Sequence, residues 1–312
     1  MIQIDNLVKS FGAKRAVDGV SFTVERGEVL GFLGPNGAGK STTMRMITGV
    51  MPPTAGRVSV GGHDVVQSPL AAKRLIGYLP ENAASYPDMT VKGFLNFAAE
   101  LRGLKGDAKK RGVNRAVELC FLESVLNQSI DTLSKGYRHR TCLAQALIHD
   151  PEVLIMDEPT DGLDPNQKHG VRALIDEMAE DKAIIISTHI LEEVESICTR
   201  AVIIAQGRIV ADARPEELKR RSRYHNAVRL TVNANLPPKL QPLLESLPGV
   251  AAVERAGAVN GVAILLVVPR PNVDVSRDVS DLIRRSGIAF DELVIEQGRL
   301  DDVFRELTMH GH

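Results

Sequence analysis

The sequence has no tryptophan and only three cysteines. Phe, Trp and Tyr together make up 4% of its 312 residues, so any hydrophobic core must be built mainly from aliphatic side chains. Cys120, Cys142 and Cys198 are far apart in the chain, and no pair has the spacing of metal ligands. Such a sparse, odd set does not make a disulfide framework, which favours a reducing compartment.

Long hydrophobic runs and an excess of one charge are also absent. No stretch reaches the roughly 18 apolar residues that a membrane span needs, and the N-terminal MIQIDNLVKS lacks the features of a signal peptide. Lys plus Arg number 38 and Asp plus Glu 39, which gives a formal net charge of −1 and argues against a protein that coats nucleic acid. We therefore expect a cytoplasmic protein with no nucleic-acid partner, held at a membrane only through another protein.

What is present indicates an α/β fold. Hydrophobic residues make up 44% and charged residues 25% of the chain, as in an ordinary globular protein. Short apolar segments predict strands at Val29–Leu33, Val153–Met156, Ala183–Ser187 and Ala201–Ala205, with helical segments between them. From about Thr90 to Leu126 apolar residues recur at helical spacing. Strands that alternate with helices predict a mostly parallel sheet.

A charged segment, Arg214–His225, predicts a boundary between two domains. After it, the predicted elements follow the order β-α-β-β-α-β, with one further helix at Leu300–Leu307. That order is typical of a ferredoxin-like domain. We therefore expect a first domain over residues 1–221, with a helical subdomain at about residues 87–150, and a C-terminal α+β domain over residues 222–312.

The strongest local signal is the segment from Gly34 to Ser41, GPNGAGKS, between a predicted strand and a predicted helix. It has the spacing G-x-x-x-x-G-K-[ST] of a phosphate-binding loop. Its glycines allow backbone N–H groups to turn around phosphates, and the helix N-terminus adds a partial positive charge. Lys40 supplies a cation for the outer phosphates, and the Ser41 hydroxyl is a ligand for Mg²⁺. This loop predicts that the chain binds a nucleoside triphosphate.

Two carboxylates follow the predicted strand Val153–Met156. Asp157 and Glu158 lie at the carboxyl end of that strand, the edge at which open α/β sheets bind ligands. In that place Asp157 is expected in the Mg²⁺ shell, and Glu158 is expected to polarise an attacking water. A strand that ends in a charged turn is the alternative for the dipeptide alone.

Two further segments indicate nucleotide binding only in combination with the phosphate loop and the two carboxylates. Ser134, in the pentapeptide LSKGY, is a candidate N-cap for a helix whose exposed N–H groups would make a second anion site, although a routine helix cap is the favoured explanation of the pentapeptide alone. His189 follows the strand Ala183–Ile186 and is placed to hydrogen-bond a terminal phosphate, although a lone histidine is more often structural.

Together and in this order, these segments resemble the ATP-binding subunit of an ATP-binding cassette (ABC) transporter over about residues 1–220. The resemblance places the Walker A loop on Gly34–Thr42, the signature motif on Leu133–Tyr137, the Walker B strand on Val153–Asp157, the catalytic glutamate on Glu158, the D-loop on Asp161–Asp164 and the switch histidine on His189. It implies a P-loop NTPase cassette with a RecA-like core and a helical subdomain.

The resemblance also implies the site residues. ATP is then bound by Phe11, Gly34, Asn36, Gly37, Ala38, Gly39, Lys40, Ser41 and Thr42 of one chain and by Ser134 and Gly136 of a second. Phe11 is expected to stack on the adenine, with a core position as the alternative. The implied Mg²⁺ ligands are Ser41, Glu81 and Asp157, and the implied catalytic residues are Glu158 and His189.

The chain departs from the family at two positions. Glu81 stands where the family usually has a glutamine, so a carboxylate oxygen replaces an amide oxygen and adds negative charge. The signature reads LSKGY rather than LSGGQ, which keeps Ser134 and Gly136 and adds the positive charge of Lys135. We expect Glu81 to remain a contact and Lys135 to favour phosphate.

The variants YLPEN and LSKGYRHR resemble cassettes that drive ABC-2 type exporters, nearest to gliding-motility and antibiotic or multidrug export ATPases. The implied function is ATP hydrolysis coupled to export, with two cassettes, expected as a homodimer, beneath a polytopic membrane permease. One alternative is a soluble ABC ATPase that acts in DNA repair or translation. Another is a ligand-regulated ATPase in which the C-terminal domain binds a small molecule, although a dimerisation surface is the simpler role for that domain.

Overall fold

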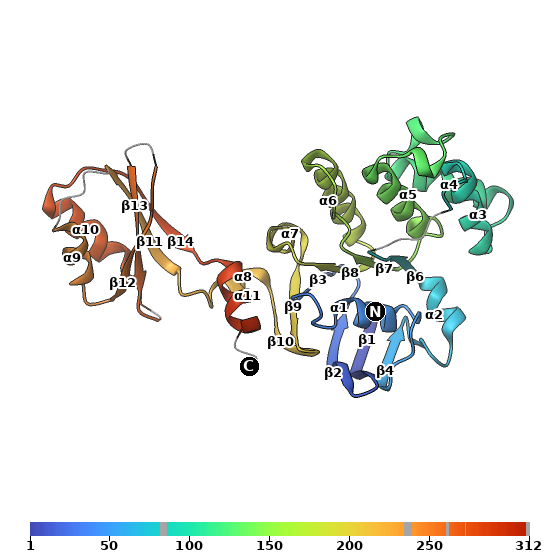
Figure 1. Ribbon diagram of the computed structural model, residues 1–312, viewed down its shortest axis with the longest axis horizontal. Coiled ribbons are helices and arrows are strands. Elements are labelled where there is room, and N and C mark those ends of the chain that lie inside the picture. Colours follow the sequence, from blue (N-terminus) through green and yellow to red (C-terminus); the bar gives the residue numbers. More distant parts are fainter. Residues whose placement is uncertain (82–85, 234–238, 260–261, 272, 310–312) are drawn as a thin grey trace. The chain divides into compact units, whose positions relative to one another are not determined.

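Two compact units make up the chain, residues 1–213 and residues 214–309 (Figure 1). The computed structural model describes residues 1–81, 86–233, 239–259, 262–271 and 273–309. Within these ranges, no helix is both long and apolar enough to cross a bilayer. The three cysteines are buried and free.

A six-stranded sheet in the order β10-β9-β3-β8-β7-β6 organises the first unit. Its strands are β3 (Val29–Leu33), β6 (Ile76–Leu79), β7 (Val153–Asp157), β8 (Ala183–Thr188), β9 (Arg200–Ala205) and β10 (Arg208–Ala213). All neighbouring pairs are parallel except β9 with β10. Every residue of β3, β7 and β8 is buried, as expected for parallel strands covered on both faces. The predicted α/β class is confirmed.

A second, antiparallel sheet packs in the same unit, in the order β2-β1-β4-β5. Its strands are β1 (Ile2–Phe11), β2 (Lys14–Val24), β4 (Ala55–Val60) and β5 (His63–Asp64). Aliphatic side chains of both sheets join one core around helix α1 (Lys40–Ile47), and Phe22 contacts Phe32 with ring centroids 5.5 Å apart. This core fixes α1 behind the loop that leaves β3.

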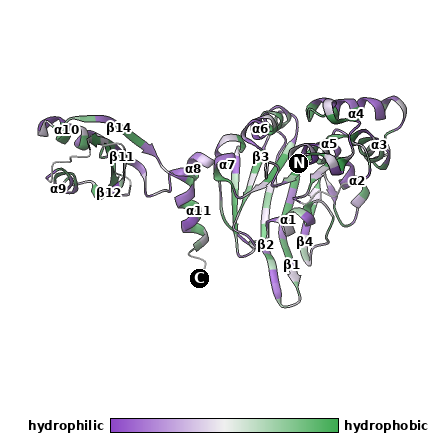
Figure 2. Ribbon diagram, turned by 45° about the horizontal axis from the view of Figure 1, so that its top comes forward, coloured by the Kyte–Doolittle hydropathy of each residue, from purple (hydrophilic) through white to green (hydrophobic). Residues whose placement is uncertain are grey.

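Helices make up the remainder of the first unit. They are α2 (Pro69–Leu75), α3 (Val91–Leu101), α4 (Gly106–Leu119), α5 (Lys135–Leu147), α6 (Pro165–Ala179) and α7 (Leu191–Ile197), with short 3-10 turns η1 (Glu123–Val125) and η2 (Ile130–Thr132). Helices α3, α4 and α5 pack against one another (Figure 1). The helical periodicity predicted from residue 90 corresponds to α3 and α4, and much of the α4 ribbon has the hydrophilic colour in Figure 2.

The second unit has the predicted β-α-β-β-α-β order. It begins with α8 (Pro215–Lys219) and continues through β11 (His225–Asn233), α9 (Leu240–Glu245), β12 (Val250–Val259), β13 (Val262–Pro269), α10 (Ser276–Ser286), β14 (Phe290–Gln297) and α11 (Leu300–Met309). The antiparallel sheet runs β12-β13-β11-β14, and one face packs with α9 and α10. Helix α8 contacts α11, so the unit begins at Arg214 rather than at residue 222.

Candidate functional site

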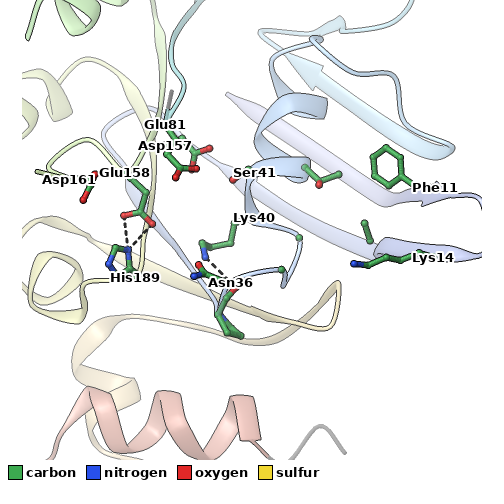
Figure 3. Close-up of a pocket in the computed structure, with 15 residues that line it drawn as sticks. Phe11, Lys14, Asn36, Lys40, Ser41, Glu81, Asp157, Glu158, Asp161 and His189 are labelled. Atoms are coloured by element: carbon green, nitrogen blue, oxygen red, sulfur yellow. Dashed lines mark hydrogen bonds and ion pairs between the residues drawn. The ribbon is translucent and has the colours of Figure 1, made fainter. Parts of the chain in front are cut away.

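A pocket of about 670 Å³ opens in the first unit, beside the carboxyl ends of the parallel strands (Figure 3). The loop after β3, the turn after β6 and the turns after β7 and β8 all reach it, because parallel strands end at the same edge of a sheet. Its lining residues are Phe11, Lys14, Ala16, Pro35, Asn36, Gly37, Gly39, Lys40, Ser41, Thr42, Glu81, Asp157, Glu158, Asp161 and His189.

The loop from β3 to α1 requires glycine at two close approaches. Gly39 has φ +112°, and a Cβ there would lie 2.6 Å from the carbonyl oxygen of Ala16. At Gly34 a Cβ would collide with the carbonyl oxygen of Ile204. The loop can therefore lie against β2 and β9 and expose its backbone N–H groups, with the N-terminus of α1 behind them.

Lys40 is the buried cation of the pocket. Its side chain is 8% exposed, and Nζ donates to the carbonyl oxygens of Gly34 at 2.6 Å and Pro35 at 3.3 Å. Burial lowers the pKa of Lys40, and the charges of Glu158 and Asp157 act in the opposite direction. The two carbonyl partners are neutral, so the ammonium charge is available to an anion in the pocket.

Asp157 ends β7 with a nearly fully buried carboxylate. It is 3% exposed and accepts a hydrogen bond from the Ser187 hydroxyl. The hydroxyl of Ser41 and the carboxylate of Glu81 line the same pocket (Figure 3). These are hard oxygen donors of the kind that Mg²⁺ prefers. Among the residues described, no group of three or more His, Cys, Asp or Glu side chains is arranged to hold a metal ion by itself.

Glu158 and His189 form a hydrogen-bonded pair at the pocket (Figure 3). Nδ1 of His189 lies 2.9 Å from each carboxylate oxygen of Glu158. Glu158 has φ +53°, and its backbone N–H donates to the Ser187 carbonyl, so the chain turns sharply where β7 ends. Burial raises the pKa of Glu158, and the hydrogen bond from His189 lowers this pKa by a smaller amount. A carboxylate with a raised pKa is a better proton acceptor from water.

Most of the predicted site residues line this pocket, and four do not. The phosphate loop contributes Asn36, Gly37, Gly39, Lys40, Ser41 and Thr42. Gly34 and Ala38 are not among the lining residues; Ala38 is 3% exposed and packs into the core instead. Phe11 lines the pocket and is 49% exposed, so the alternative of a core position is wrong.

Ser134 and Gly136 are the other two predicted contacts, and they do not line the pocket. The Ser134 hydroxyl caps α5 by accepting from the Tyr137 N–H at 3.4 Å. Gly136 is buried, and a Cβ there would collide with the side chain of Gln167 in α6. The predicted helix cap is confirmed, and Ser134 itself is exposed.

Sequence reasoning missed some lining residues. Lys14 lies directly across the hairpin from Phe11, paired in the β1–β2 register, so the sequence FGAK held a signal for it. Asp161 also lines the pocket, and its pKa is lowered first by the hydrogen bond from Lys135, whose Nζ is 3.0 Å away. That ion pair joins the LSKGY segment to the turn after β7.

Comparisons with known proteins agree with this geometry. Residues 17–161 match the family described as ABC transporter. A linearmycin resistance ATP-binding protein of Bacillus subtilis is 39% identical over 235 residues, which are 75% of this chain and 75% of that protein. A Nod factor export ATP-binding protein of Paraburkholderia xenovorans is 39% identical over 218 residues, 70% of this chain and 72% of that protein.

Solved structures show the same fold. A structure described as an ATP-binding subunit of an ABC transporter superposes with a TM-score of 0.66 at 31% sequence identity. The match covers 71% of this chain and 92% of that one.

Proposed function

This chain belongs to the ABC transporter family as an ATP-binding, ATP-hydrolysing subunit, and from this premise we propose that it powers an ABC-2 type membrane exporter. Two features support export. One relative of 39% identity is named for Nod factor export, and the segments YLPEN and LSKGYRHR resemble those of ABC-2 cassettes. The observation that carries the hydrolytic role is the Glu158–His189 pair, which lines one pocket with Lys40.

Hydrolysis follows from the positions of these side chains. Lys40 and the loop N–H groups hold the phosphates, and the exposed ring of Phe11 offers a stacking face for the base. Glu158 orients the water that attacks the terminal phosphate and accepts its proton, because its raised pKa favours proton uptake. His189 holds Glu158 in place and contacts the terminal phosphate. Catalysis is then mainly positioning and charge stabilisation.

The oxygen donors of the pocket fit Mg²⁺. Ser41, Asp157 and Glu81 would hold it together with phosphate oxygens, and the Ser187 hydroxyl fixes the orientation of Asp157. When bound, Mg²⁺ neutralises phosphate charge. The carboxylate of Glu81 adds negative charge where the family usually has an amide, which strengthens the attraction for the cation.

The position of Ser134 supports a dimer of cassettes. Its helix cap lies outside the lining of the chain's own pocket. An exposed helix N-terminus with a small hydroxyl beside it is nevertheless suited to bind phosphate, which must then come from another chain. In a head-to-tail pair, Ser134 and Gly136 of one copy meet the ATP held by the other. Two ATP molecules then close the dimer, and hydrolysis opens it.

A groove of about 620 Å³ beside α2 and α3 offers a docking surface for the permease. Its aromatic wall is Tyr86, Phe94 and Phe97, with the Tyr86 and Phe97 rings edge to face at 5.5 Å. Leu101 at its rim is 72% exposed. The segment from Glu81 to Phe97 includes this wall, and residues 82–85 lie outside the described residues. We assign the groove to a cytoplasmic segment of the permease.

Co-purification from native membranes tests the proposal that the chain works with an exporter permease. The tagged chain is expected to recover a polytopic membrane protein that has no cassette of its own, and ATP hydrolysis in the reconstituted complex should respond to that protein. Leu101→Asp should abolish the recovery, whereas Val50→Asp, an equally drastic change at a residue 60% exposed, should not. Recovery of ribosomal, DNA-bound or other soluble proteins alone would contradict the exporter and favour a soluble ABC ATPase.

A further inference from the structure

Glu193 is a buried carboxylate that the proposed reaction does not use. It lies in α7 and is 1% exposed, whereas the neighbouring Glu192 and Glu195 are exposed. Removing a carboxylate from water is costly unless hydrogen bonds and charges compensate it. The partners of Glu193 therefore indicate what its burial achieves.

Three side chains from other elements meet this carboxylate. The Thr160 hydroxyl donates to Oε1, and the Thr188 hydroxyl donates to Oε2 at 3.0 Å. Nζ of Lys168, in α6, lies 3.8 Å from Oε1 and supplies a positive charge. Both threonines are themselves at most 1% exposed, so these hydrogen bonds are shielded from water.

The two threonines lie next to the hydrolytic pair, Thr160 on the turn after β7 and Thr188 at the end of β8. Thr160 follows Glu158 by two residues, and Thr188 directly precedes His189. The Thr188 hydroxyl also accepts the Ile190 N–H at 3.0 Å, so one hydroxyl holds the backbone on both sides of His189. One carboxylate thus bridges the turn after β7 and the end of β8, and neither it nor the two threonines line the pocket.

We propose that Glu193 is a positioning residue for ATP hydrolysis. By holding Thr160 and Thr188 it sets the separation of the two turns, and so the 2.9 Å contact between Glu158 and His189. The inference rests on the proposed roles of Glu158 and His189. A change in this bridge moves the pair by a fraction of an ångström and leaves the phosphate loop untouched, so it acts on the chemical step rather than on ATP binding.

Matched variants at Thr160 test the bridge with the smallest change in shape. Thr160→Val replaces the hydroxyl by a methyl group, and Thr160→Ser keeps the hydroxyl. In the full chain, we expect Thr160→Val and Glu193→Gln to lower kcat about tenfold while the KM for ATP changes by less than about twofold. Thr160→Ser should stay near the parent rate. If both Thr160→Val and Glu193→Gln retain the parent kcat, the bridge has no catalytic role.

A double-mutant cycle with His189 separates positioning from general stability. If Glu193 acts through the pair, Glu193→Gln should lower the residual rate of His189→Ala by less than about twofold, measured in single turnovers at high enzyme concentration. If the two effects multiply, Glu193 supports the fold and not the pair, and the inference is wrong. Glu158→Gln at the parent rate would instead overturn the proposed hydrolytic roles themselves, so the two failures are distinguishable.

Discussion

The pocket of the first unit and the sheet of the second unit use their charges in different ways. In the first unit Lys40, Asp157 and Glu158 line a pocket, and the two hydrogen-bond partners of the Lys40 ammonium within the described ranges are neutral carbonyl groups. In the second unit the charges on the sheet pair with one another: Arg229 lies 3.7 Å from Glu292 and 3.4 Å from Glu296. Burying charged groups in a pocket lowers the stability of the fold, and we attribute their presence there to chemistry. Exposed ion pairs change the free energy of unfolding very little.

Strand direction explains much of the difference. Parallel strands in the first unit bring several carboxyl ends to one edge, and the turns beyond them carry Asp157, Glu158 and His189. The antiparallel sheet of the second unit has no edge of that kind. We expect mutations of the charged pocket residues of the first unit to change activity, and mutations of the charge pairs on the sheet of the second unit to change stability.

The largest expected effect is the loss of hydrolysis in Glu158→Gln. The amide cannot accept the proton of water, so kcat should fall about 10²–10³-fold while ATP still binds. The pKa of Glu158 is raised in the folded chain, which means that the folded state favours the neutral carboxyl group. The folded state therefore loses stability as the pH rises through that pKa and Glu158 ionises. Glutamine is neutral at every pH, and the variant should therefore have a higher Tm at neutral pH than the parent.

Phosphate release under saturating ATP and a thermal melt without nucleotide measure the two effects. Glu152→Gln, a change of the same kind at an exposed carboxylate paired with Arg26, serves as the control and should alter neither quantity appreciably. A Glu158→Gln variant that hydrolyses ATP at the parent rate would show that the base has been wrongly assigned.

Lys40→Ala should mainly weaken binding. A charge-assisted contact contributes about 1.5–3 kcal/mol, so the affinity for ATP should fall roughly 10–100-fold. Titration calorimetry of the full chain measures this. Lys182→Ala removes a lysine that is paired with Asp150 and does not line the pocket, and it should bind ATP as the parent does. If the parent, Lys40→Ala and Lys182→Ala bind ATP with equal affinity, the pocket lysine has no special role in binding and the contrast with lysines outside the pocket is wrong.

The pH dependence of kcat should be a smaller and more specific signal. Hydrolysis needs ionised Glu158, so the rate should fall about tenfold per pH unit as pH drops below its pKa, starting at a higher pH than for an ordinary glutamate. The hydrogen bond from His189 lowers that pKa, so His189→Ala should move the acid limb to still higher pH. An unmoved limb would show that the pair does not set the protonation of Glu158.

Local patterns in the sequence predicted the phosphate loop, the carboxylates after β7 and the helix cap at Ser134, because each depends on neighbouring residues. The pocket contact of Lys14 depends on its pairing with Phe11 across the turn between β1 and β2, a signal that FGAK carries but that the nucleotide-binding motifs do not include. Glu193 was missed for another reason: in LEEVE it is typical of an exposed helix face, and only the packing of α7 shows that it is buried. The nucleotide contacts of Gly34 and Ala38 stay predictions, and close packing is a second reason for their small size that local patterns do not show.

The smallest expected effect is in the second unit, where Arg229→Ala removes the cation between Glu292 and Glu296. Because these groups are partly exposed, the loss should be at most about 1 kcal/mol. Hydrogen exchange of the β11 amides in the full chain reports that stability without isolating the unit. ATP affinity and kcat should be unchanged. If either shifts by more than about twofold, the second unit senses or adjusts the nucleotide pocket, and its charge pairs belong to regulation rather than to folding alone.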